Sequence, residues 1–122
     1  MIRGSISSDL VPRVPLRFLS ETGHAREVQA VLDTGFNSEL TVPRRFVDEF
    51  GMKPLGNVRM LLGDGSEHLC PTFEAIIEWD GLPMVVVAEI CELDVMVGMG
   101  QLRGSKVLLE VEPGGDLTIE QI

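Results

Sequence analysis

The chain has 122 residues, enough for one domain with its own hydrophobic core but not for two lobes. Hydrophobic residues make up 44% of it and charged residues 24%, which is typical of a globular protein and excludes a disordered one. The formal net charge is -9 and the basic residues are scattered, which argues against the basic face that binds nucleic-acid phosphates. We therefore predict a single domain over residues 1–122, without a nucleic-acid partner.

No basic segment followed by a long apolar stretch opens the chain, so we expect no secretory signal and a cytoplasmic protein. The longest apolar run, residues 82–88, is too short to cross a bilayer and contains a proline, and we expect a buried strand there and no membrane partner. The spacing of Cys70 and Cys91 resembles neither a redox pair nor a zinc knuckle. Two small core side chains are the simplest interpretation.

Alternation of apolar and polar residues dominates the chain and predicts a mainly β protein. Apolar residues alternate over residues 14–18 and 28–32, on either side of a turn at residues 20–23. This pattern predicts a hairpin whose second strand ends at Asp33. Residues 40–42 predict a further short strand.

The best candidate for a helix follows that short strand. Pro43 suits the start of a helix, and Phe46, Val47 and Phe50 would share one face. Gly51 suits its C-terminal end.

Two hairpins are predicted next. Residues 58–62 and 67–72 flank a glycine-rich loop at residues 63–66, and residues 73–79 and 82–90 flank the turn signal Asp80-Gly81. The remaining predicted elements are a strand at residues 95–97, a helical turn at residues 99–103 that ends at Gly104, an extended segment at residues 106–111, and a strand at residues 117–119 after a turn at residues 113–116.

The sequence Asp33-Thr34-Gly35 is the strongest indication of chemistry, because it presents a carboxylate on a tight turn at the end of a strand. Two carboxylates that share a proton can activate water for attack on a peptide carbonyl. The chain has one such turn, since the Asp-Gly pairs at residues 64–65 and 80–81 lack the intervening hydroxyl residue. A second carboxylate would therefore come from another copy of the chain.

Four segments resemble the retropepsin-like (clan AA) aspartic proteases, in particular their small single-domain bacterial members. They are VLDTGFNS at residues 31–38, LTVP at residues 40–43, LGDGS at residues 62–66 and MVGMGQLRG at residues 96–104. Gly98 follows Gly35 by 63 residues, which leaves room for a helix, a flap and a further hairpin. The resemblance implies an all-β, acid-protease closed barrel with one or two short helices and a flap hairpin.

In that family each subunit supplies one catalytic Asp, so the resemblance implies a homodimer in which two copies of Asp33 form the dyad. It implies hydrolysis of an extended peptide or protein by activated water, without a metal or another cofactor. Thr34 would hydrogen-bond across the two-fold axis, and Gly35 would let the backbone turn close to substrate. Gly98 would pack beneath the catalytic turn.

The loop Gly63-Asp64-Gly65 falls where the family keeps the flap that covers the substrate. Asp64 differs from the apolar flap tips of viral relatives, and an ordinary exposed hairpin is an alternative interpretation. The segments at residues 1–6 and 117–122 could interleave between subunits.

Two alternative functions stay open. The chain could be a dimeric peptide-binding or scaffold module with little or no proteolytic activity, or Asp33 could be a turn residue in an unrelated β-barrel. Other site patterns are weak: His24 and His68 lack metal-ligand spacing, and Ser66 lacks the context of a nucleophile.

Overall fold

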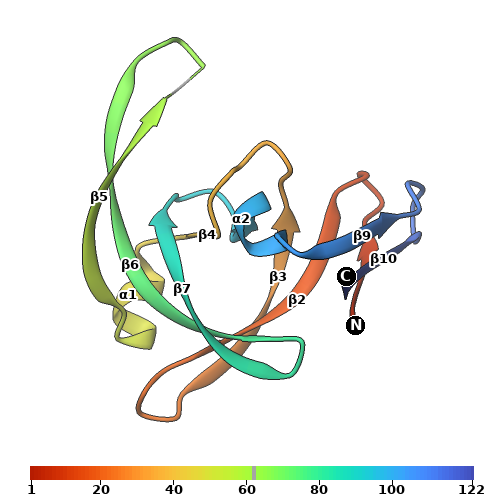
Figure 1. Ribbon diagram of the computed structural model, residues 1–122, viewed down its shortest axis with the longest axis horizontal. Helices are drawn as coiled ribbons and strands as arrows, with labels where there is room; N and C mark the ends of the chain where they lie inside the picture. The colour runs from red at the N-terminus through yellow and green to blue at the C-terminus, as the bar shows by residue number, and fades with distance from the viewer. Residues whose placement is uncertain (62) are drawn as a thin grey trace.

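A computed structural model describes residues 1–61 and 63–122 (Figure 1). The protein is all-β with two short helices, as the sequence predicted. Its elements are β1 (Ile2–Ile6), β2 (Pro12–Leu19), β3 (Ala25–Leu32), β4 (Leu40–Val42), α1 (Arg45–Phe50), β5 (Lys53–Leu61), β6 (Glu67–Trp79), β7 (Leu82–Ile90), β8 (Met96–Val97), α2 (Met99–Leu102), β9 (Ser105–Leu109) and β10 (Asp116–Gln121). Leu62, which we assigned to a strand and to the flap motif, lies outside the described residues.

Six strands form a closed, mixed β-barrel. Going round the ring, β2 pairs antiparallel with β3, β3 parallel with β8, and β8 antiparallel with β4. From there β4 pairs parallel with β7, β7 antiparallel with β6, and β6 returns to β2 between Arg17↔Glu78 and Leu19↔Ile76. The predicted closed barrel is confirmed, and its six strands leave no open edge within the ring.

Every second residue of these strands points into the barrel interior, which is why the alternation of apolar and polar residues in the sequence predicted the strands. Phe18 of β2 is fully buried and meets Phe46 of α1 edge-on at 5.2 Å between ring centroids. Phe50 of α1 lies 5.5 Å from the same ring. Burial of each such side chain contributes about 1.5–3 kcal/mol, so α1 is held mainly by its apolar face.

The end of α1 is as the sequence predicted, whereas α2 ends at Leu102, one residue before the predicted end at Arg103. Gly51 follows α1 with φ of 62°, a left-handed conformation that glycine adopts without strain, and Gly104 follows α2 with φ of 81°. With six and four residues, α1 and α2 are short, and no helix in the described part of the chain is long and apolar enough to cross a membrane.

Two long hairpins share strand β6, which pairs with β5 in one and with β7 in the other. Asp80 and Gly81 both have positive φ, which is the geometry of the predicted two-residue turn. β6 is one continuous strand where we expected two pieces, and β5 and β6 extend beyond the barrel as an arm (Figure 1). The expectation of a buried strand at residues 82–88 is wrong for its first half, since Leu82 is 70% and Val85 60% exposed.

The two ends of the chain form a three-stranded extension beside the barrel. β1 pairs with β10, and β10 pairs with β9. Ser5↔Arg13 and Ile6↔Pro12 join this extension to β2. Among the described residues no strand pairs with the outer edge of β9.

Candidate functional site

Asp33 lies directly after β3, at the point where that strand leaves the barrel wall. Val31 and Leu32 pair in parallel with Met96 and Val97 of β8. The backbone N–H of Asp33 then donates to the carbonyl oxygen of Val97 over 2.9 Å. The acid is therefore attached to two strands of the barrel and not to a free loop.

The turn holds one oxygen of the Asp33 carboxylate. The backbone N–H of Gly35 donates to Asp33 Oδ1 over 2.9 Å, and the N–H of Phe36 donates to the Asp33 carbonyl over 3.2 Å. A Cβ atom on Gly35 would lie 3.3 Å from Oδ1, so this close approach favours glycine. Thr34 and Gly35 are exposed and Asp33 is half-buried, which leaves the site open to solvent.

Gly98 packs against the loop that follows the Asp33 turn. A Cβ atom on it would lie 2.3 Å from the carbonyl oxygen of Ser38 and 2.5 Å from the ring of Phe36. The N–H of Gly98 donates to the Glu39 carbonyl over 2.9 Å, and the N–H of Met99 to the Phe36 carbonyl over 2.7 Å. The segment at residues 98–99 thus holds the loop at residues 36–39 in place.

Asp33 and Thr34 line a cleft of about 590 Å³, which we call the Asp33 cleft. Its volume lies in the range of small-molecule and peptide sites. Its wall is mostly apolar, and among the described residues that line it Asp33 alone carries a carboxylate and Arg103 alone a cationic side chain. The lining residues are Pro12, Leu32, Asp33, Thr34, Met99, Leu102, Arg103, Gly104, Ser105, Val107 and Leu109.

Residues 63–66, the described part of the glycine-rich tip of the β5–β6 arm, are not among those that line this cleft in the single chain. Asp64 Oδ1 accepts hydrogen bonds from the hydroxyl and from the backbone N–H of Ser66, and these lower the pKa of the Asp64 carboxyl. Gly65 has φ of 86° and completes the turn. Within the chain Asp64 therefore shapes the tip, and Gly63 stands beside it in the turn.

Sequence reasoning missed several residues that surround Asp33. Arg103 and Ser105 line the cleft, and Gly100 donates its N–H to the Ser38 carbonyl over 3.0 Å. All three lie within or just after the motif at residues 96–104. The polar residues that follow its helical turn, Arg103 and Ser105, were the sequence feature that could have indicated a lining of this cleft.

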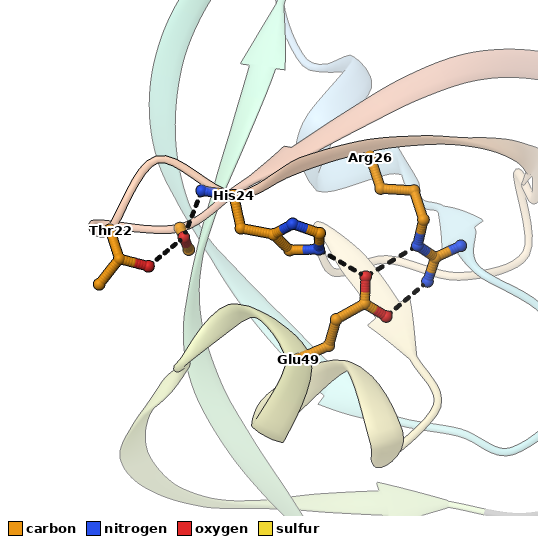
Figure 2. A network of polar contacts seen from close by, with 5 residues as sticks. Thr22, His24, Arg26 and Glu49 are labelled. Atoms are coloured by element: carbon orange, nitrogen blue, oxygen red, sulfur yellow. Dashed lines mark hydrogen bonds and ion pairs between the residues drawn. The ribbon is translucent and has the colours of Figure 1, made fainter.

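A polar network links the β2–β3 hairpin to α1, at the opposite end of β3 from Asp33 (Figure 2). Arg26 binds both carboxylate oxygens of Glu49 at 2.8 Å, and His24 Nε2 lies 3.0 Å from one of them. The hydrogen bond from Arg26, followed by that of His24, lowers the pKa of Glu49 to about 2. His24 also stacks on Phe50 with ring centroids 5.2 Å apart, so this network joins secondary structure elements.

Among the described residues, no group of three or more His, Cys, Asp or Glu side chains is arranged to hold a metal ion. Comparison of the chain with family models, with curated proteins and with solved structures found no match. The chemistry that the geometry offers is therefore that of one oriented carboxylate beside a largely apolar cleft.

Proposed function

We propose that the protein is a retropepsin-like aspartic endopeptidase with an acid-protease fold, active as a homodimer. The observation that carries this proposal is the Asp33 carboxylate, which the Gly35 N–H orients at the edge of the Asp33 cleft. The Asp-Thr-Gly turn, its attachment to β8 and the closed barrel beneath it all support this function.

Two Asp33 side chains from two chains would supply the chemistry. Like charges at close range cannot both ionise at low cost, so the pair keeps one proton. The ionised carboxylate takes a proton from water as that water attacks the peptide carbonyl, and the protonated one donates to the developing oxyanion. Hydrolysis then proceeds without a covalent intermediate or a cofactor.

The need for a second chain follows from the single carboxylate in the cleft. β9 offers the surface for it, because none of the described strands pairs with its outer edge, and a strand edge of this kind favours pairing with another chain. Leu108, Leu109 and Val111 expose apolar side chains in and just after this strand, and Leu109 also lines the Asp33 cleft. β1 and β10 pair within one chain, so β9 replaces the interleaved termini as the expected contact.

The β5–β6 arm would supply the flap. Leu61 and Leu69 are 71% and 69% exposed near its tip, and exposed apolar side chains of this kind favour contact with another molecule. In the proposal, Gly63, Asp64 and Gly65 fold over an extended peptide and exclude water from the dyad.

The substitution Asp33→Asn tests this function, because the amide keeps the shape of the side chain but cannot share the proton. We expect cleavage of a peptide library, assayed from acidic to neutral pH, to fall at least about a hundredfold while sedimentation still reports a dimer. Asp80→Asn is the matched control, since asparagine suits a turn of this type before Gly81. Unchanged cleavage by the Asp33 variant would refute the assignment, and a wild-type dimer that binds peptides without cutting them would favour the binding module.

A further inference from the structure

The chain has two cysteines: Cys70 lies in β6, and Cys91 directly follows the end of β7. The ladder between β6 and β7 places Thr72 opposite Glu89. Continuing the same register by two residues places Cys70 opposite Cys91. Both are free thiols. The sequence alone does not indicate that the two cysteines are neighbours, because their placement depends on the register of the β6–β7 hairpin.

The local contacts agree with this register. Cys70 Sγ lies 3.4 Å from the carbonyl oxygen of Ile90, which belongs to the peptide bond that joins Ile90 to Cys91. Residues directly opposite on antiparallel strands have Cα atoms about 4.5–5.5 Å apart and side chains on one face. Disulfides span Cα distances of about 4.4–6.8 Å, a range that includes the spacing expected of residues in this register.

The two thiols differ in access to solvent. Cys70 is 8% exposed and Cys91 is half-buried. Burial raises the pKa of the Cys70 thiol, and the charges of Glu89 and Cys91 raise it further against the lowering effect of its hydrogen bond. A reagent in solution therefore meets Cys91 first, while Cys70 is placed to react with whatever forms there.

We propose that Cys70 and Cys91 form a thiol modification site that a small-molecule disulfide converts into an intramolecular disulfide. The thiolate of Cys91 attacks one sulfur of the reagent, which forms a mixed disulfide and releases one thiolate of the reagent. Cys70 then loses its proton and attacks Cys91 Sγ, which releases the second thiolate. Two protein thiols are oxidised, and the reagent is reduced to two thiols that take up the two protons.

The disulfide would join the part of β6 that belongs to the arm to the segment that follows β7. Cys70 lies in the part of β6 that pairs with β5 in the arm, opposite Val58. The N–H of Cys91 donates to the Val42 carbonyl over 2.9 Å, and the chain then leads to Val95, which accepts from the N–H of Val31 just before the Asp33 turn. Oxidation would therefore connect the base of the arm to the segment that supports β3. This thiol chemistry does not depend on whether the protein cleaves peptides.

Oxidised glutathione is the probe, and mass spectrometry after alkylation of the remaining thiols is the readout. We expect the full-length chain to lose the mass of two hydrogen atoms, to resist alkylation, and to give one linked peptide pair containing both cysteines. Dithiothreitol should restore two reactive thiols. In Cys70→Ser the glutathione adduct on Cys91 should live at least about tenfold longer than in the wild type, since no neighbouring thiol at millimolar effective concentration resolves it.

Cys91→Ser is the matched control, and its buried Cys70 should take up glutathione more slowly than Cys91 does in Cys70→Ser. The proposal is overturned if the wild type accumulates a stable glutathione adduct, if its disulfide links two chains, or if both thiols stay free under conditions that modify Cys70→Ser.

Hydrogen exchange gives a second measurement on the wild type alone. Amides of residues 58–61 and 67–70 should exchange more slowly after oxidation, and equal rates would contradict a bond at the base of the arm.

Discussion

Replacing Gly98 by alanine tests how the barrel positions the Asp33 turn. The backbone of Gly98 has φ of -96°, which any residue adopts, so the effect of the added methyl group is steric. That methyl group would lie 2.3 Å from the Ser38 carbonyl oxygen, 2.5 Å from the Phe36 ring and 2.7 Å from the Phe36 carbonyl oxygen. Two of these three atoms belong to the backbone and cannot move away by rotating a side chain.

The size of the effect follows from these contacts. The loop must move by about 0.7 Å or more to bring the Ser38 oxygen back to a tolerable distance. Overpacking of this kind costs about 1–3 kcal/mol of unfolding free energy. Because the loop at residues 36–39 follows directly from the Asp33 turn, the carboxylate should shift with it. A displacement near 1 Å lowers turnover by about a hundredfold in well-positioned sites.

Urea unfolding measures the stability change, and peptide cleavage by the dimer measures the positional effect. Gly63→Ala is the control for stability, since no described atom beyond its chain neighbours lies within 4 Å of an added Cβ there and its φ is not in the left-handed region. We expect the Gly98 variant to be less stable than this control, and to cleave peptides far more slowly than the wild type. A Gly98→Ala protein with wild-type stability and wild-type turnover would refute the idea that this glycine supports the turn.

Two further predictions concern the surface of the protein. Glu49→Gln should lower the unfolding free energy by about 1 kcal/mol at neutral pH, because the paired Arg26 is solvent-exposed and screening limits the interaction. The pKa of Glu49 is lowered from 4.5 to about 2, so the stabilisation by the Glu49 carboxylate is complete above about pH 4.5 and is lost as the pH falls through 2. The urea midpoints of wild type and Glu49→Gln should therefore converge as the pH falls from 4.5 to 2, and a constant difference between them would contradict this prediction. Leu109→Lys on the open edge of β9 should prevent dimerisation and abolish cleavage, whereas Leu82→Lys, at a side chain that is 70% exposed away from the cleft, should do neither in sedimentation and cleavage assays.

The features that the sequence predicted correctly are those with local causes. Asp80-Gly81 determines a hairpin turn from two adjacent residues, and Gly51 ends a helix through its own conformation. The place of Asp33 at a strand end likewise follows from the apolar alternation before it.

The features that it did not predict depend on pairs of residues far apart in the chain. The pairing of Arg17 with Glu78, which helps to close the barrel, leaves no periodic signal in either strand. The position of Arg103 in the lining of the cleft likewise depends on the three-dimensional arrangement. Hydrophobicity alone also failed to separate an exposed hairpin end from a buried strand at residues 82–85.

The carboxylates of two Asp33 residues, one from each chain, provide the most direct test of the proposed dyad. A crystal structure of the assembled protein gives the distance between their nearest oxygens. The proposal predicts a symmetric dimer in which that distance is about 3 Å, close enough for a shared proton and one bound water. A dimer that holds the two carboxylates on opposite faces, or a protein that stays monomeric while cleaving peptides, would contradict it.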